Sequence, residues 1–376
     1  MVIVGGGPCG ASAAITLARR GVKPLVLESR PEPELKVGEC LPPSTTPILE
    51  RLGLAGLLER DGHLPSHGNR SVWGGPEPVE RDFIFGTQGH GWQLDRLKFE
   101  ATLAARAVEE GADWRYGSRL IECSSRGGVC TLSVRTPSGP EAVEADFVID
   151  ATGRPSRVAR QFGARRLRHD RLISTAMLFT SPAGGGIKEN VTLVEAVANG
   201  WWYSARLPGD KLMAAYMIDS DLADRGVRER DGWLALLGET DHTLRRVRGG
   251  GYTPLSGPHV LQANSSRLDA AVGKCWLAAG DAATAFDPLS SYGISSALGG
   301  GYYAASAVLD LFDGNADALP SYQKLIDGAY AQYLLMHHAY YSLEQRWAGE
   351  TFWRRRHGNG SDVLKQALPK IRKEEV

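Results

Sequence analysis

The hydrophobic pattern at the start of the chain predicts a strand, a helix and a second strand within the first 28 residues. An apolar run over residues 2–4 is typical of a buried strand, and a helix-like pattern extends from the glycine-rich turn 5–10 to Arg20. A second apolar strand over 25–27 ends at Glu28. Strand, glycine turn, helix, strand and acid follow one another in the order typical of a dinucleotide-binding unit.

The rest of the chain mixes helical and alternating patterns and predicts an α/β fold. Helices are expected over 44–57, from the N-cap Asp95 onward, and over 220–238, 291–311 and 319–347. Strands are expected within 63–92 (including 81–85), as three short strands between 114 and 149, and over 172–180, 191–197, 201–207, 211–218 and 273–279. The pattern indicates a dinucleotide fold interrupted by a second, strand-rich domain.

The residue types of the opening unit suit a bound nucleotide. Gly5 lets the chain turn sharply off the first strand, Gly7 lets the backbone approach a pyrophosphate, and Gly10 lets helix and strand pack closely. The amides and the dipole of the following helix then face the phosphates. Glu28 can accept hydrogen bonds from a ribose hydroxyl pair, and its charge would repel a 2′-phosphate.

Composition narrows the class of protein. The chain has 376 residues, which favours two packed domains, and its 43% hydrophobic and 23% charged content is typical of a globular protein. A net charge of zero gives no electrostatic argument for binding nucleic acid or an anionic membrane. No apolar run reaches the roughly 20 residues of a membrane span, and the chain opens on a core strand, which predicts no signal peptide.

The cysteines and histidines indicate neither a disulfide framework nor a metal site. Five cysteines, an odd number without framework spacing, favour a reducing compartment, so we expect a cytoplasmic protein. No pair of them has the spacing of a zinc site. We expect no metal, and a monomer or a homodimer.

Two later strands end in small-residue turns. One strand runs into Ala151-Thr152-Gly153 and the other into Gly280-Asp281, as expected where backbone packs against a cofactor. The carboxylate of Asp281 suits a ribitol-type hydroxyl. The following turn, 286–293, opens a helix whose N-terminus could stabilise negative charge on a reduced flavin ring.

With these motifs, the chain resembles the flavin-dependent monooxygenases of the p-hydroxybenzoate hydroxylase fold over nearly its whole length. Three shorter segments are similar to sequences of the tryptophan-halogenase-like branch of this family. They are Val37-Gly38-Glu39, 163–166 and 287–293. The resemblance implies FAD as the cofactor and NAD(P)H as the electron donor. It also implies a Rossmann-like FAD-binding domain, interleaved with a mixed or antiparallel β-sheet substrate domain and followed by C-terminal helices.

The resemblance implies a division of the chain. The FAD-binding domain is expected in 1–62, 93–165 and 265–315, the substrate domain in 63–92 and 166–264, and a C-terminal helical segment in 316–376.

The matching motifs carry the expected FAD-binding residues. They are Gly5, Gly7, Pro8, Cys9, Gly10, Glu28, Ser29, Arg30, Gly38, Glu39, Cys40, Arg96, Ala151, Thr152, Gly153, Gly280, Asp281, Pro288, Ser291, Gly293 and Ile294. Arg96 resembles the family's helix-start arginine near the ribityl and phosphate part of FAD. Cys9 stands at a helix N-terminus, which is expected to lower its thiol pKa. Cys9 and Cys40 are candidates for a redox pair or a covalent flavin link, with simple packing as the alternative.

Pocket residues are less well marked than the cofactor residues. Trp201, Trp202 and Tyr203 are candidates for the wall of a pocket for an aromatic ring, with sheet packing as the alternative. His90 precedes the Arg96 helix and is a candidate residue near the flavin, with an exposed loop position as the alternative. No catalytic base is identified.

Two departures separate the chain from halogenases. Halogenases need a lysine beyond the Gly-Glu turn, and here no lysine occurs between Lys36 and Lys98. They also carry a WxWxIP motif, whereas this chain has GWWYSARLP over 200–208. We therefore expect transfer of oxygen from a reduced flavin to an electron-rich aromatic ring.

The C-terminal aromatic run over 340–355 resembles flavoproteins needed to build tryptophylquinone cofactors in partner amine oxidases or dehydrogenases. The expected substrate is therefore a tryptophan side chain of such a partner, with core packing as the alternative role of the aromatic run. Other functions left open are hydroxylation or halogenation of a small aromatic molecule, reduction of isoprenoid double bonds, and a non-catalytic role in binding a partner.

Overall fold

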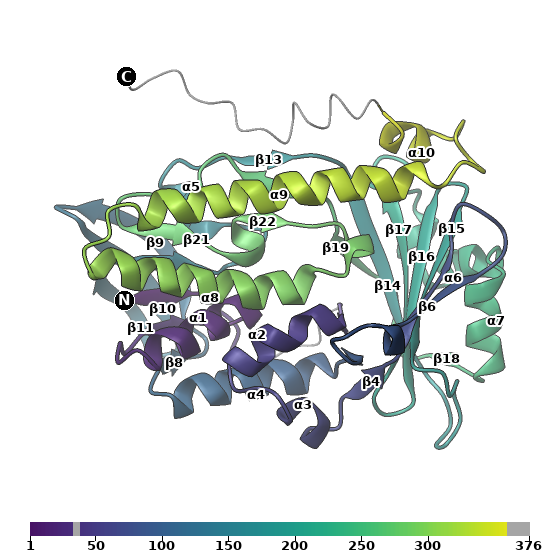
Figure 1. Cartoon of the computed structure of the whole chain (residues 1–376), viewed down its shortest axis with the longest axis horizontal. Coiled ribbons are helices and arrows are strands. Elements are labelled where there is room, and N and C mark those ends of the chain that lie inside the picture. The colour runs from purple at the N-terminus through teal and green to yellow at the C-terminus, as the bar shows by residue number, and fades with distance from the viewer. Residues whose placement is uncertain (33–37, 359–376) are drawn as a thin grey trace.

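A five-stranded parallel sheet forms the centre of one half of the molecule (Figure 1). The computed structural model describes residues 1–32 and 38–358. The strand order is β21-β12-β1-β2-β8, and every neighbouring pair is parallel. The strands are β1 (Val2–Val4), β2 (Leu25–Leu27), β8 (Asp113–Arg115), β12 (Val148–Asp150) and β21 (Trp276–Ala278). Because all strands run the same way, the turns that follow them meet at one edge of the sheet.

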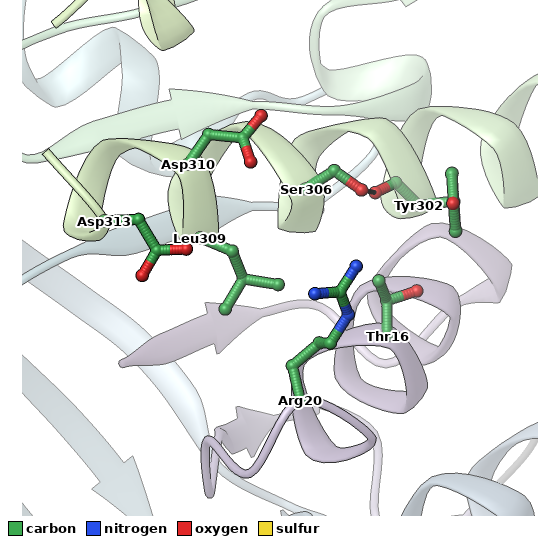
Figure 2. A pocket seen from close by; sticks show the side chains of 7 residues that line it. All are labelled: Thr16, Arg20, Tyr302, Ser306, Leu309, Asp310 and Asp313. Carbon is green, nitrogen blue, oxygen red and sulfur yellow. Dashed lines mark hydrogen bonds between the residues drawn. The ribbon is translucent and has the colours of Figure 1, made fainter. Parts of the chain in front are cut away.

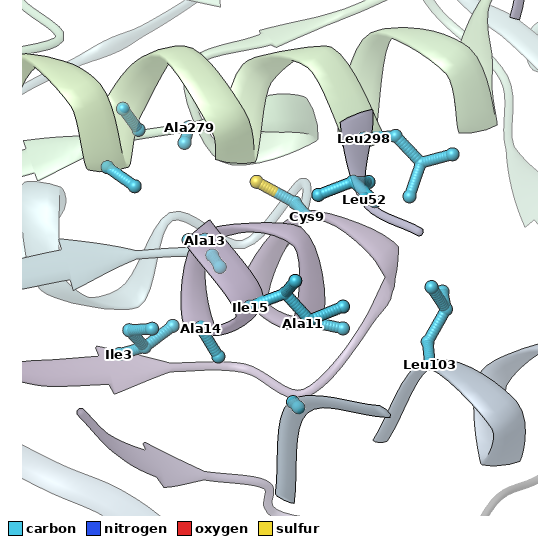
Figure 3. Close-up of a cluster of buried hydrophobic side chains, with 14 of the residues drawn as sticks. Ile3, Cys9, Ala11, Ala13, Ala14, Ile15, Leu52, Leu103, Ala279 and Leu298 are labelled. Carbon is cyan, nitrogen blue, oxygen red and sulfur yellow. The ribbon is translucent and has the colours of Figure 1, made fainter. Parts of the chain in front are cut away.

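Two helices pack together over this sheet. They are α1 (Pro8–Ala18) and α8 (Gly293–Phe312), and small residues let their backbones approach closely. A Cβ added to Gly301 would lie 2.1 Å from the carbonyl oxygen of Cys9, and the Ser12 hydroxyl donates to the carbonyl of Leu298 over 2.6 Å. Figure 3 shows Cys9 and Ala13 on the side of α1 that faces α8.

The other half of the molecule is built on an eight-stranded sheet. Its strand order is β18-β14-β17-β16-β15-β5-β6, and β19 also pairs with β14. The strands are β5 (Gly68–Val72), β6 (Val79–Asp82), β14 (Leu172–Thr180), β15 (Val191–Val197), β16 (Gly200–Leu207), β17 (Lys211–Asp219), β18 (Thr253–Pro254) and β19 (His259–Gln262).

Both faces of the large sheet are covered by helices. The helices α6 (Arg230–Gly238) and α7 (His242–Gly249) pack on one face, where Trp202 and Trp233 are buried. The C-terminal part of α9 (Ala318–Ser342) and the helix α10 (Thr351–Arg356) pack on the other face. Figure 1 shows α9 running from the parallel sheet to the large sheet, so this helix spans both halves.

Smaller elements complete the fold. The additional strands are β3 (Cys40–Leu41), β4 (Leu64–Ser66), β7 (Gly91–Gln93), β9 (Arg119–Arg126), β10 (Val129–Thr136), β11 (Gly139–Ala145), β13 (Arg166–Arg168), β20 (Ser266–Leu268) and β22 (Thr284–Ala285). The additional α-helices are α2 (Thr46–Arg51), α3 (Leu57–Arg60), α4 (Arg96–Glu109) and α5 (Arg157–Gln161). Short 3-10 turns cover Pro43–Thr45, Phe83–Phe85, Gly226–Arg228, Gly280–Ala282 and Pro288–Ser290.

The expected α/β class is confirmed, and several elements lie where the pattern predicts them. The strands 172–180 and 191–197 match residue for residue. The N-cap of α4 is confirmed, because the Asp95 carboxylate accepts from the amide of Lys98 over 3.1 Å.

Other expected elements are wrong in their bounds, and glycine is the usual reason. The helix expected over 44–57 is broken into α2 and α3, because Gly53 and Gly56 adopt φ of +66° and +76°. The three strands expected between 114 and 149 are five, β8 to β12, and the turn between β9 and β10 is made by Gly127 and Gly128 with positive φ.

Three further elements are shorter than expected. The strand expected over 81–85 ends at Asp82, where a 3-10 turn begins. The helix expected over 220–238 begins only at Arg230, after a 3-10 turn at Gly226–Arg228. The last long helix ends at Ser342 rather than at Trp347.

Some sequence expectations lie outside the described residues. They are Val37 of the Val-Gly-Glu segment and the part of the C-terminal segment beyond residue 358. Among the helices that the structure describes, none combines the length and the hydropathy that crossing a membrane requires.

Because α1 and α8 pack closely, a single methyl group added between them should change the free energy of unfolding. Gly301→Ala should lower the free energy of unfolding by about 1–3 kcal/mol, because the new Cβ collides with backbone atoms of α1. Gly299→Ala is the matched control, since an added Cβ there meets no atom within 4 Å. It should raise stability by about 0.5–1 kcal/mol. Urea denaturation of both variants checks this, and equal effects would contradict the close packing.

Candidate functional site

The glycine turn between β1 and α1 has the shape of a phosphate cradle. Gly5 has φ +107°, and a Cβ added there would lie 2.3 Å from the carbonyl oxygen of Ala151. A Cβ added to Gly10 would lie 1.9 Å from the oxygen of Gly5. At Gly7, the N-cap of α1, an added Cβ meets nothing within 4 Å, and no side chain caps the helix. The first amides of α1 therefore face an open approach that fits a pyrophosphate.

Glu28 is fixed at the edge of the sheet directly after β2. Its Oε2 accepts from the amide of Gly6 over 2.7 Å, and its Oε1 accepts from the amide of Arg30 over 2.8 Å. The Ser29 hydroxyl lies 3.3 Å from Oε1. Each carboxylate oxygen has more than one lone pair, so these bonds hold Glu28 in place and leave it able to accept from ribose hydroxyls.

The turn after β12 is held by the buried carboxylate of Asp150. It accepts from the amide and the hydroxyl of Thr152 over 3.0 and 2.7 Å, and from the amides of Val158 and Ala159 over 2.9 Å each. Burial raises the pKa of Asp150, and these hydrogen bonds oppose the rise. The bonds place Ala151, Thr152 and Gly153 (φ +71°) beside the glycine turn.

Asp281 lies in a polar recess together with two arginines. Its Oδ2 is 3.6 Å from Nε of Arg154, and Arg166 donates to the carbonyl oxygens of Asp281 and Ala282 over 2.8 and 2.7 Å. Burial raises the pKa of Asp281, while the charges of both arginines and of Arg96 lower it. The side chain is still 35% exposed, so the carboxylate remains open to a ligand.

The arginines of this recess were missed as site residues by the sequence reasoning. A signal was present for each, since Arg154 follows the Ala-Thr-Gly turn directly and Arg166 belongs to the segment 163–166.

Asp287 is the hub of the turn before α8. Its buried carboxylate accepts from the Leu289 amide over 2.8 Å, the Tyr341 hydroxyl over 2.8 Å and Nε2 of His337 over 3.2 Å. Its backbone amide donates to the Tyr333 hydroxyl over 2.9 Å. Burial alone would raise the pKa of Asp287, but these hydrogen bonds hold it below its usual value. The carboxylate is therefore ionised and fixed.

The partners of Asp287 come from one stripe of α9 and were missed by the sequence reasoning. Tyr333, His337 and Tyr341 are four residues apart, a spacing that places them on one helix face and that the sequence contains. Tyr341 also accepts from the indole nitrogen of Trp201 on β16 over 2.8 Å. The turn is thus connected to the large sheet.

The start of α8 is open where the turn ends. Ser291 adopts φ +54°, Ile294 is buried, and a Cβ added to Gly293 would meet no atom within 4 Å. The turn Pro288–Ser290 precedes them. Since α1 and α8 run in the same direction, the positive ends of both helix dipoles lie toward the same side of the molecule.

Arg96 and the Gly38-Glu39 loop close the site from the other side. The Arg96 guanidinium donates to the carbonyl of Gly38 and to the carboxylate of Glu100. Glu39 is 2% exposed, and burial raises its pKa to about 7 against the opposing charge of Arg96. Cys40 follows in β3, which pairs with β7.

Trp201, Trp202 and Tyr203, the candidates for a pocket wall, do not share one face of the sheet. Successive residues of β16 point to opposite faces, so Trp201 and Tyr203 share one face and Trp202 lies on the other. Trp202 packs against Trp233 with ring centroids 4.9 Å apart, beneath α6 and α7. Trp201 packs in the cluster of Tyr341, and only Tyr203 is half-buried.

The position of His90 and the thiol pKa of Cys9 also differ from what their proposed functional roles would require. His90 is exposed, and its ring packs on Trp92 with centroids 4.7 Å apart, which is the loop position given as the alternative. The expected lowering of the Cys9 pKa is wrong, because burial and the charges of Asp281 and Asp150 raise it. Cys9 and Cys40 both carry free thiols, so no disulfide joins them.

A surface hollow lies away from the edge that carries these residues. Its volume is about 70 Å³, and it is lined by Thr16, Arg20, Tyr302, Ser306, Leu309, Asp310 and Asp313 (Figure 2). These residues extend from the middle of α8 to the residue after its C-terminal end and include the C-terminal part of α1 and Arg20, whereas the glycine turn and Gly293 stand at the N-terminal ends. The hollow is therefore separate from the candidate cofactor site.

Fold and sequence together define a flavin-dependent oxidoreductase whose similar proteins include flavin-dependent halogenases. The family described as "FAD binding domain" matches residues 1–199, and the chain belongs to this family. FAD is its cofactor.

Similar proteins cover nearly the whole chain. A putative FAD-dependent oxidoreductase, LodB of Marinomonas mediterranea, is 28% identical over 360 residues, which are 95% of this chain and 96% of LodB. The myxobacterial chondrochloren halogenase CndH has a similar structure, with a TM-score of 0.88 and 22% identity over 97% of this chain and 87% of CndH. The peptidyl tryptophan dihydroxylase QhpG, essential for tryptophylquinone cofactor biogenesis, has a TM-score of 0.78 and 24% identity over 95% of this chain and 78% of QhpG.

The hub at Asp287 predicts an acid-sensitive contribution to stability. Asp287→Asn should lower the free energy of unfolding by about 3 kcal/mol at pH 8, because it removes a buried charge from two donors on α9. Since the folded-state pKa of Asp287 is lowered, wild type loses this contribution as pH falls below the usual carboxyl range. Asp313→Asn, at an exposed position, is the control. Denaturation at pH 8 and pH 2 checks this, and a difference of undiminished size at pH 2 would contradict it.

The buried carboxyl group of Glu39 should make the free energy of unfolding depend on pH in the opposite direction. Its folded-state pKa of about 7 lies above the ordinary value, so it costs stability as pH rises from the ordinary carboxyl range to about 7, and the cost is constant at higher pH. Flavin-free Glu39→Gln should be more stable than wild type by about 3 kcal/mol at pH 8 and equal to it near pH 5. Denaturation across this range measures the difference, with Glu50→Gln on the exposed face of α2 as the control. A variant less stable than wild type at pH 8 would show that Glu39 is paired in the folded state.

Proposed function

We propose that this protein is an FAD-dependent monooxygenase that hydroxylates an aromatic ring. Its substrate is a tryptophan side chain of a partner oxidase or dehydrogenase, modified during formation of a tryptophylquinone cofactor. NAD(P)H supplies the electrons.

The observation that carries the proposal is the absence of lysine between Lys36 and Lys98. Similar halogenases need a lysine in this segment. Arg70, a basic residue within it on β5, is held in ion pairs with Glu80 and Glu189 over 2.6 and 3.0 Å. Together with the missing WxWxIP motif, this favours transfer of oxygen over transfer of a halogen.

The relatives support the choice of substrate. LodB, described as an oxidoreductase, aligns over nearly the full length of both chains. QhpG acts on peptidyl tryptophan and shares the fold over 95% of this chain. The aromatic residues 341–353 pack as core against β16, so support for a protein substrate comes from the similarity to QhpG.

The chain contributes binding, orientation and charge. When bound and reduced, FAD supplies the activation of molecular oxygen. The glycine turn and Glu28 bind the nucleotide end, and Asp281 accepts from the ribityl chain. Asp287 fixes the turn at the start of α8, whose N-terminus stabilises negative charge on the flavin ring. The sheet face that carries Tyr203 receives the aromatic substrate.

Halogenation is the second candidate function. The structural similarity to the halogenase CndH, with a TM-score of 0.88, favours it. The test must therefore offer the enzyme both oxygen and halide.

The protein with FAD and NADH or NADPH is incubated under ¹⁸O₂ with a tryptophan-containing segment of a candidate partner, in chloride and bromide. We expect ¹⁸O in the indole ring and no halogen by mass spectrometry. A halogenated product would favour the second candidate, and oxidation of the reduced protein without labelled product would contradict hydroxylation.

Gly7→Val is the matched inactive control. A side chain at Gly7 meets no protein atom within 4 Å, so the variant should fold with unchanged thermal stability in the flavin-free form. The side chain occupies the approach to the first amides of α1, so FAD affinity should fall at least about 100-fold, with loss of product. Full retention of FAD would show that the pyrophosphate lies elsewhere.

A further inference from the structure

A buried polar cluster lies where the small sheet β3-β7-β4 meets strands β15 and β16 of the large sheet. Its floor is satisfied in part, because Nε2 of Gln93 donates to the hydroxyls of Thr192 and Ser66 over 2.9 and 3.3 Å, while Oε1 of Gln93 has no partner among the described residues. The Thr192 hydroxyl also lies 3.8 Å from Sγ of Cys40. These contacts join the Gly-Glu loop to the large sheet.

Besides Gln93, two members of the cluster have buried polar atoms without a hydrogen-bond partner among the described residues. Both carboxylate oxygens of Glu39 and the hydroxyl of Tyr203 are buried and have no hydrogen-bond partner. Glu39 is 2% exposed. A buried polar atom without a partner typically costs about 1–3 kcal/mol, and a charged one costs more. Such a cluster is explained when a ligand completes it.

The chemistry of the cluster selects a hydrogen-bond donor. An ionised carboxylate can only accept, and the Tyr203 hydroxyl lies close enough for the charge of Glu39 to raise its pKa. The groups that face Glu39 are Arg96 from α4, Cys40 from β3 and Tyr203 from β16. Arg96 donates to Gly38 and Glu100, and the amides of Gly38 and Glu39 face the carboxyl without making a full hydrogen bond, so the carboxylate can accept from a ligand.

We propose that Glu39 accepts a hydrogen bond from the ring N–H of an indole substrate and that the Tyr203 hydroxyl, which has no partner within the part of the chain that the structure describes, donates to the same carboxylate once the indole is bound. This proposal rests on the proposed function and names the feature of the substrate that the site recognises. A negative charge beside the N–H also raises the electron density of the ring, which favours attack by an electrophile. An aromatic ring without an N–H at this position would leave the carboxylate unpaired and should bind poorly.

Burial gives this recognition a pH dependence. Because the Glu39 pKa is raised to about 7, the carboxylate that accepts the N–H forms only above neutral pH. Binding of an indole should therefore be tighter at pH 8 than at pH 6.

The test is binding to the FAD-loaded, oxidised protein without reductant. The probes are N-acetyl-tryptophanamide and its 1-methylindole analogue, which differ in the N–H alone. The change in the flavin absorption spectrum and isothermal calorimetry report binding. We expect the N–H probe to bind about tenfold or more tightly than the methylated probe at pH 8.

Three variants separate the roles. Glu39→Gln should abolish the preference for the N–H probe and its pH dependence, measured with each protein saturated with FAD. Tyr203→Phe should weaken the preference severalfold. Glu50→Gln, on the exposed face of α2, is the matched control and should keep both the preference and its pH dependence.

Each contrary result overturns the inference. Equal affinity for the two probes, or no binding of either up to their solubility, would exclude indole recognition at Glu39. A loss of FAD affinity in Glu39→Gln would assign the carboxylate to the flavin instead. Because this assay needs no turnover, its failure is distinct from a failure of the ¹⁸O experiment, which tests the oxygen transfer itself.

Discussion

The carboxylate of Asp287 connects three parts of the molecule that are far apart in the sequence. It accepts from its own turn and from two side chains of α9, and Tyr341 in turn accepts from Trp201 on the large sheet. A buried charge with several donors of fixed geometry is strong and directional. The turn that opens α8 is therefore held against both halves of the molecule, and the position of a flavin ring at this turn depends on that carboxylate.

Around Asp287, the charges that shape the site come from nearby side chains and helix ends, and not from the net charge of the protein. The net charge is zero, yet Arg154 and Arg166 lie beside Asp281. The N-termini of α1 and α8 add positive dipole ends on the same side. The small residues between these helices let the two N-termini approach, so packing in the core determines where an anionic cofactor is bound. At Glu39, by contrast, burial raises the pKa and so disfavours the ionised carboxylate. Binding of a hydrogen-bond donor would favour the ionised form again.

Local patterns could be predicted from the sequence, whereas pairings between distant segments could not. The glycine turn, the N-cap Asp95 and most strands follow from residue spacing. The partners of Asp287 lie 50 and 54 residues away along the chain, so no local pattern relates them. The faces of Trp201 and Trp202 alternate as a strand requires, but which helices cover each face is set by later segments. The pKa of Cys9 follows burial that the helix N-terminus alone does not reveal.

The proposed site has the flavin ring at the Asp287 turn and the indole N–H at the Glu39 carboxylate. A crystal structure with FAD and N-acetyl-tryptophanamide tests it most directly. The flavin ring should contact the turn 288–293, and the indole N–H should lie within hydrogen-bond distance of the Glu39 carboxylate. An indole bound elsewhere, such as on the Trp202 face of the sheet, or a flavin ring away from the start of α8, would contradict the account.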